Sequence, residues 1–223
     1  LTASQKSIYN RDTDARNNLW RAVAYACHPD AWGVQIVFDN QVILGTRARK
    51  TRTKSFNAFS SIDYPETAMF RDRRLIQFLQ RPTEYTHAVF STALDPNVFV
   101  LRLVPGMRAD IIPMLEGRYR ALVLESFGVG GLPGGDDGAM FAAVRDWCGA
   151  GHLAVFTTQV PHEGSDLAVY EVGRAAKALP GVLEAHDMTP EATAVKLMWV
   201  LGQTTDRAEA EKLFLTPVQW DIL

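Results

Sequence analysis

The feature that most constrains the fold is an alternation of short apolar runs with helical segments in the second half of the chain. Val98–Val104, Ala121–Glu125 and Leu153–Thr157 are apolar and short enough to form buried strands. Arg108–Leu115 and Asp137–Cys148, which lie between them, have the spacing of helices. Strands that alternate with helices predict an α/β fold with mainly parallel sheets.

The first half alternates less regularly. Asp14–Cys27 repeats apolar residues at intervals of three and four, which predicts a helix that Thr13 or Asp14 could cap. Gly33–Phe38 and Gln41–Leu44 flank a two-residue turn signal and predict a β-hairpin. A further helix is predicted over Pro65–Leu79.

Periodicity fades between residues 83 and 96, where polar and turn-forming residues increase. This stretch is interpreted as a linker between an amino-terminal domain, residues 1–82, and a carboxyl-terminal domain, residues 97–223. The remaining predicted helices are Asp166–Ala178, Pro190–Leu201 with Thr189 as its cap, and Asp206–Phe214.

Composition excludes several classes of protein. The 223 residues include 47% hydrophobic residues and carry a net charge of −2, which is typical of a soluble globular chain and gives no reason to expect a nucleic-acid partner. No apolar run approaches about 18 residues, so no membrane span is expected. The two cysteines lie in unrelated segments, which favours a reducing compartment, and the histidines lack metal-ligand spacing.

The chain begins Leu1-Thr2-Ala3-Ser4-Gln5, without a methionine or a signal sequence. This start is similar to the end of a buried strand. The expectation is therefore a fragment, a processed chain or one subunit of a split protein.

A basic stretch, RARKTRTK at residues 47–54, holds five cations. A charge run of this kind is usually a solvated loop, and a nucleic-acid patch would place aromatic residues between the cations. The glycine-rich stretch after Ser126 is not a phosphate loop, because its glycines do not have the G-x-G-x-x-G spacing and Pro133 removes a backbone donor.

Five stretches, in order along the chain, resemble those of the L-asparaginase family, closest to its cytoplasmic, type I branch. LTASQKS resembles I-T-G-S-Q, and TDARNNL resembles S-D-G-x-x-N-L. TRARKTRTKSFNAF resembles N-R-T-T-K-x-x-A-x-x-F-D-A-F, and ALVLESFGVGGLP resembles A-L-V-L-R-S-Y-G-V-G-N-A-P. VYEVGRAA, followed by DMTPEATAVKL, resembles G-Y-x-x-G-x-A and D-M-T-x-E-A-x-x-x-K-L.

The resemblance implies a role for the basic stretch. Lys50 falls where the family keeps the lysine of its Thr–Lys–Asp triad, so a buried or crowded Lys50 with a lowered pKa is expected. The other four cations are expected to be solvated. The resemblance also implies substrate-binding or site-geometry roles for Ser4, Gln5, Asp14 and, more loosely, Glu171.

The departures from the family pattern are equally informative. The motifs T-G-G-T-I and H-G-T-D-T, which carry the family's nucleophilic threonine and its aspartate, do not occur in this chain. Glu125, Arg49 and Val160 replace an arginine, a threonine and a cysteine of the family motifs, which argues against allosteric control by asparagine, and Gly131 replaces the asparagine of G-V-G-N.

The resemblance therefore implies an asparaginase-like α/β fold, with an incomplete flavodoxin-like amino-terminal domain and a smaller carboxyl-terminal α/β domain. The expected reaction is hydrolysis of the L-asparagine side-chain amide to L-aspartate and ammonia, without metal or cofactor. A cytoplasmic homo-oligomer, a dimer or tetramer, is expected, with no nucleic-acid or membrane partner. Three alternatives remain: an asparaginase-like subunit of a tRNA-dependent amidotransferase, an inactive regulatory or scaffolding subunit, and a nucleic-acid binder that uses the basic loop.

Overall fold

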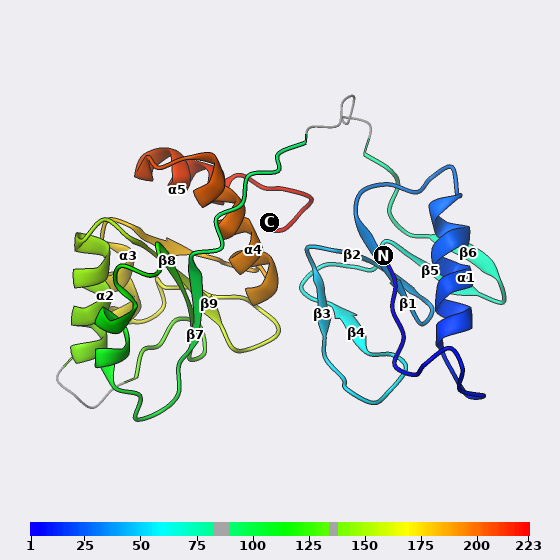
Figure 1. The fold of residues 1–223 in the computed structure, drawn as a ribbon, viewed down its shortest axis with the longest axis horizontal. Coiled ribbons are helices and arrows are strands. Elements are labelled where there is room, and N and C mark those ends of the chain that lie inside the picture. The colour runs from blue at the N-terminus through cyan, green and yellow to red at the C-terminus, as the bar shows by residue number, and fades with distance from the viewer. Residues whose placement is uncertain (83–89, 134–137) are drawn as a thin grey trace. The chain divides into compact units, whose positions relative to one another are not determined.

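The computed structural model describes residues 1–82, 90–133 and 138–223 and divides the chain into two compact units, Leu1–Phe90 and Ser91–Leu223 (Figure 1). The predicted linker falls partly on residues 83–89, and the predicted helix start at Asp137 also lies outside the described residues.

The first unit is built on an antiparallel sheet with strand order β1-β2-β5-β6. Helix α1, Ala15–Ala26, lies against β1, and Tyr25 contributes to a core that it shares with the sheet. A second sheet has two strands, β3 and β4, and the basic stretch includes β3. The strands of the first unit are β1 Gln35–Phe38, β2 Gln41–Leu44, β3 Ala48–Lys50, β4 Phe59–Ser61, β5 Ala68–Arg71 and β6 Arg74–Gln77.

The helix after Asp14 and the β1–β2 hairpin are confirmed, but the helix predicted over Pro65–Leu79 is wrong. That segment forms the β5–β6 hairpin instead. Ala68 and Phe70 are buried while Met69 and Arg71, which point to the other face, are not, and this period of two is that of a strand. The two-residue connection after Arg71 then reverses the chain.

The expectation of mainly parallel sheets is wrong for the described strands of the first unit. Among the described residues of the first unit, a parallel contact is found at Leu1. There the Leu1 amino group donates to the Gln35 carbonyl at 2.7 Å, and the Val37 N–H donates to the Leu1 carbonyl at 2.8 Å. This is the bonding pattern of neighbouring parallel strands, so Leu1 lies along β1 as an additional strand would.

The second unit has a parallel sheet, as predicted, and its strand order is β10-β9-β8-β7. Alternate residues of the central strands belong to two cores: Leu122 and Phe156 share one with residues of α2 and α3, whereas Val123 and Val155 share the other with residues of α4 and α5. The sheet is thus covered on both faces (Figure 1). The elements are β7 Val98–Arg102, β8 Ala121–Ser126, β9 Leu153–Thr158, β10 Val182–Glu184, α2 Ala139–Gly149, α3 Glu171–Lys177, α4 Pro190–Gln203 and α5 Arg207–Leu215.

Two helices of this unit differ from prediction. Arg108–Leu115 forms two short 3-10 turns, η1 Ala109–Ile111 and η2 Pro113–Leu115, because Pro113 has no N–H to continue a helix. The helix predicted from Asp166 begins only at Glu171. The short strand β10 was not predicted.

The start of α4 follows the prediction. The Thr189 hydroxyl accepts the Ala192 N–H at 3.1 Å, and Pro190 occupies the first turn. In the described part of the chain, no helix is long and apolar enough to cross a bilayer. Both cysteines are free thiols, Cys27 exposed and Cys148 buried.

Candidate functional site

The candidate site of the first unit is organised by the carboxylate of Asp14, which lies just before α1. This carboxylate accepts the backbone N–H of Gln5 at 2.8 Å and that of Lys6 at 3.0 Å. It therefore does not cap its own helix; instead the Thr13 hydroxyl accepts the Ala15 N–H at 3.0 Å. The result is a clamp that fixes residues 5 and 6 against the start of α1.

The side chain of Gln5 joins this clamp to the basic loop. Its Nε2 donates to the Ser55 carbonyl at 3.0 Å, and its Oε1 accepts a hydrogen bond from Lys50 Nζ at 2.9 Å. The Lys6 ammonium lies 5.4 Å from the centre of the Phe56 ring, which adds a second contact between the same two segments. Lys50, Gln5 and Asp14 are therefore connected through successive hydrogen bonds.

The environment of Lys50 differs from the expectation. Lys50 was expected to be buried or crowded; it ends β3 opposite Phe59 and is exposed, so the expected burial is wrong. Arg47 was expected to be solvated, but it has no exposed surface and lies 5.6 Å from the Tyr64 ring centre. A short hairpin presents residue 50 outward and turns residue 47 toward the interior of the unit. Arg52 is exposed, as expected for a loop cation.

Hydrogen bonding sets the charge state of Asp14. Burial by itself raises the pKa of this carboxyl, but the N–H groups of Gln5, Lys6 and Asp14 itself and the Asn18 amide together lower its pKa below the ordinary value of 3.8. Asp14 is thus an anion at neutral pH that holds the backbone, and it has no proton to supply as a general acid.

Asn18 is a member of this network that the sequence interpretation missed. Only 1% of its surface is exposed; its amide donates to the Ala3 carbonyl at 3.0 Å and to Asp14 at 3.1 Å. Its Oδ1 accepts the Asp39 N–H at 3.0 Å, in the turn between β1 and β2. The available signal was the asparagine of the N-L pair in TDARNNL, four residues after Asp14 and therefore on the same side of the helix.

The other two predicted residues are not brought into this network. Ser4 is exposed, and its side chain makes no hydrogen bond within the described residues. Glu171 is exposed at the first position of α3 in the second unit, where a carboxylate favours the positive end of the helix dipole. Their proposed contacts with substrate stay predictions.

The geometry suits acid–base work by Lys50 more than metal chemistry. A neutral lysine amine that gives one N–H to Gln5 keeps a lone pair for accepting a proton, and the glutamine restricts where that lone pair points. Within residues 1–82, 90–133 and 138–223, no three metal-ligating side chains are grouped together. The network can therefore orient a base, and within the described residues the hydrogen bond of Lys50 Nζ goes to Gln5 and not to a hydroxyl or a thiol.

Comparison with known proteins gives matches along nearly the whole chain. The family model "Asparaginase, N-terminal" matches residues 1–84, and the model "Glutaminase/Asparaginase C-terminal domain" matches residues 97–214. An L-asparaginase of Thermococcus kodakarensis is 36% identical over 213 residues, which are 96% of this chain and 64% of that protein. A glutamyl-tRNA(Gln) amidotransferase subunit of Pyrococcus furiosus is 32% identical over 228 residues, 97% of this chain and 50% of that protein.

Solved structures agree with these matches. The thermostable L-asparaginase from Thermococcus kodakarensis superposes with a TM-score of 0.92 at 34% identity, covering 100% of this chain and 67% of the other. L-asparaginase I from Vibrio cholerae has a TM-score of 0.82 at 24% identity, covering 100% of this chain and 66% of the other, which supports the fold alone. The chain thus spans about half to two thirds of the length of these relatives. On the strength of the two family models and the shared fold, this chain belongs to the asparaginase family.

Proposed function

We propose that the chain supplies the base, Lys50, and its supporting network to an amidohydrolase that converts L-asparagine to L-aspartate and ammonia. The observation that carries the proposal is the hydrogen bond from Lys50 Nζ to Gln5 Oε1 at 2.9 Å, on a backbone held by Asp14. This arrangement occurs at the position that the family resemblance assigns to the triad lysine. The 36% identical L-asparaginase supports asparagine as the substrate.

The reaction follows ordinary acyl-transfer chemistry. Lys50 accepts the proton of a threonine hydroxyl, whose oxygen attacks the side-chain carbonyl of asparagine. Collapse of the tetrahedral intermediate breaks the C–N bond, and the protonated lysine returns a proton to the leaving ammonia. Water then hydrolyses the ester, which releases aspartate and regenerates the hydroxyl. In this proposal the threonine comes from outside the 223 residues, because neither T-G-G-T-I nor H-G-T-D-T occurs in them.

A chimera tests this proposal. The segment that precedes the matched part of the Thermococcus kodakarensis enzyme is fused ahead of Leu1, and ammonia release from L-asparagine is measured. The chimera is expected to be active and the 223-residue chain alone inactive. Lys50→Met is expected to lower kcat by about 10²- to 10⁴-fold, which is the usual contribution of a general base.

Two variants serve as matched controls for Lys50. Arg52→Ala and Lys54→Ala remove one positive charge each from the same exposed loop and should change kcat by less than about threefold, because exposed charges are strongly screened. Equal losses in all three variants would mean that Lys50 acts only through the charge of the loop. The contrary result is that the 223-residue chain alone releases ammonia and that a substitution within it abolishes this activity. This result would place the nucleophile in these 223 residues and contradict the proposal.

A second candidate function has its own support. The amidotransferase subunit of Pyrococcus furiosus is 32% identical over 97% of this chain. The same base would then release ammonia for transfer to a glutamyl-tRNA. The test measures amide hydrolysis by the chimera with and without glutamyl-tRNA(Gln). A several-fold higher rate with the tRNA would favour this function, whereas an unchanged rate would favour the asparaginase.

A further inference from the structure

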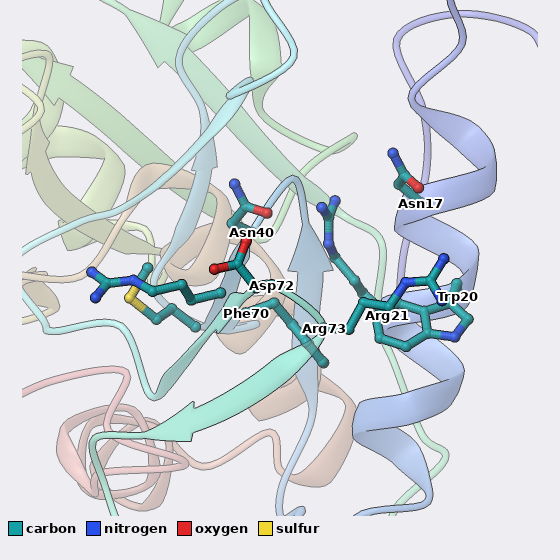
Figure 2. A pocket seen from close by; sticks show the side chains of 9 residues that line it. Asn17, Trp20, Arg21, Asn40, Phe70, Asp72 and Arg73 are labelled. Atoms are coloured by element: carbon teal, nitrogen blue, oxygen red, sulfur yellow. The ribbon is translucent and has the colours of Figure 1, made fainter.

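An open pocket of about 600 Å³ lies beside α1 in the first unit (Figure 2), and its lining includes neither Lys50 nor Gln5 or Asp14. Three arginines line it: Arg21 from α1, and Arg71 and Arg73 from the β5–β6 hairpin. Trp20 and Asp72 also line the pocket. None of the five belongs to the hydrogen-bond network of the candidate site.

Two of the guanidinium groups are held in place. Arg21 Nη1 donates to the Asp39 carbonyl at 2.7 Å, and the Arg73 guanidinium lies 5.6 Å from the centre of the Trp20 ring. Trp20 itself packs edge-on against Phe70, with ring centres 5.8 Å apart. Figure 2 shows Arg73 beside the indole of Trp20. These contacts position the guanidinium groups of Arg21 and Arg73 and leave N–H donors of each group available to a ligand.

The positive charge of the pocket is not neutralised by neighbouring carboxylates. Within the described residues, Arg21, Arg71 and Arg73 form no ion pair, whereas several arginines of the second unit each pair with an aspartate or a glutamate. Asp72 lines the pocket without pairing to any of the three. Three guanidinium groups and one carboxylate give the lining a charge of about +2.

The turn that carries Arg73 has an unusual backbone. Asp72 and Arg73 form the two-residue connection between β5 and β6, with φ of 48° and 63°. Turns with both central residues in this left-handed region favour Asn-Gly or Asp-Gly, since a side chain at the second position is strained. An arginine occupies the second position here, and strained residues of this kind gather at binding sites.

We propose that this pocket binds a small organic phosphate monoester. A phosphate monoester carries a charge between about −1.5 and −2 at neutral pH, which matches the lining, and its oxygens fit the paired N–H donors of guanidinium groups. The pocket volume leaves room for an organic group beside the phosphate. A carboxylate of the same size carries a charge of only about −1 and is the weaker ligand.

The test titrates phenyl phosphate, inorganic phosphate and benzoate into the 223-residue chain at constant ionic strength. Binding is followed by the ¹H–¹⁵N NMR signals of the Trp20 indole and the Asn40 carboxamide, both in the pocket lining. Phenyl phosphate should shift these signals saturably and bind at least about tenfold more tightly than benzoate, because charge-assisted pairs with a dianion are stronger.

Variants separate the pocket from general electrostatic attraction. Arg73→Gln and Arg21→Gln should each weaken phenyl phosphate by about tenfold or more, and Asp72→Asn should strengthen it several-fold because the lining gains one net positive charge. Arg74→Gln is the matched control: Arg74 is exposed on the same hairpin but does not line the pocket, so binding should change by less than about twofold. Increased affinity in Asp72→Asn cannot result from misfolding.

Three results would overturn the proposal. One is that neither phenyl phosphate nor inorganic phosphate shifts the Trp20 and Asn40 NMR signals in a saturable way. Another is equal weakening by Arg74→Gln and Arg73→Gln, which would mean diffuse attraction only. The third is binding of a ten-nucleotide oligouridylate at least about 100-fold tighter than phenyl phosphate and steeply weakened by salt, which would make this surface an RNA-binding one.

Discussion

Asp14→Asn is the substitution that most directly tests the clamp in the candidate site. Asparagine has nearly the same shape as aspartate but replaces one oxygen with an NH₂ group. Oδ1 accepts the Lys6 N–H at 3.0 Å, and Oδ2 accepts the Gln5 N–H at 2.8 Å and the Asn18 amide at 3.1 Å. Whichever way the new carboxamide turns, at least one of these donors faces another donor.

The expected cost follows from that mismatch. A buried donor left without an acceptor costs about 1–3 kcal/mol, and bonds to a charged acceptor lie toward the upper part of that range. We therefore expect the opening free energy of this segment to fall by about 2 kcal/mol, which corresponds to about 30-fold faster hydrogen exchange. The Asp39 N–H is the best reporter, because it bonds to Asn18 at 3.0 Å and is not altered by the substitution.

The pH dependence gives an independent check. The folded-state pKa of Asp14 lies below the ordinary value of 3.8, so the folded state binds the proton more weakly than the unfolded state does. The stability that Asp14 contributes is therefore fully present above that ordinary value and is lost as the pH falls through the lower, folded-state value. The advantage of the wild type over Asp14→Asn should be constant near neutrality and shrink in acid.

Asp12→Asn is the matched control. Asp12 pairs with the Lys6 side chain at the surface, so the same change of charge should alter exchange very little. Two results would refute the clamp. One is hydrogen exchange of the Asp39 N–H at the same rate in Asp14→Asn and in the wild type. The other is an effect of Asp14→Asn that stays the same in acid.

Three further predictions concern the second unit. Gly173→Ala should lower the thermal midpoint, because the new Cβ would lie 2.5 Å from a backbone oxygen, whereas Gly149→Ala, with open space around it, should raise stability by about 0.5–1 kcal/mol. Lys196→Met should cost about 3–5 kcal/mol in urea unfolding by leaving Asp221 buried and unpaired, and adding Asp221→Leu should recover most of that loss. A fragment of residues 97–223 should keep its amide protection, because both faces of its sheet are covered; uniform loss of protection would contradict this.

Several elements could be predicted because a local pattern was sufficient. The buried strands β8 and β9 are continuous apolar runs, as expected of strands covered on both faces. The start of α4 follows from a threonine cap and a proline, which act within a few residues of each other. The motif order indicated the asparaginase family, and two models of that family match residues 1–84 and 97–214.

Local patterns failed where long-range pairing decided the outcome. Pro65–Leu79 contains no glycine or other strong turn signal, so its reversal at Asp72 and Arg73 was not visible until β5 paired with β2. The short strand β10 is stabilised chiefly by its pairing with β9. Propensity is a weak guide in such segments, because tertiary context overrides it.

For the candidate site, the sequence by itself determined which residue types were available: a lysine in a basic loop, an aspartate before a helix and a Ser-Gln pair near the start. Only the tertiary structure decided that Gln5 connects Asp14, through its backbone N–H, to Lys50, through its side chain, and that Asn18 connects Asp14 to the β1–β2 turn. It also decided that Arg47 is buried while Lys50 is exposed. The physical reason is that hydrogen bonds between residues 45 positions apart depend on how the segments pack, and one sequence pattern is compatible with many such packings.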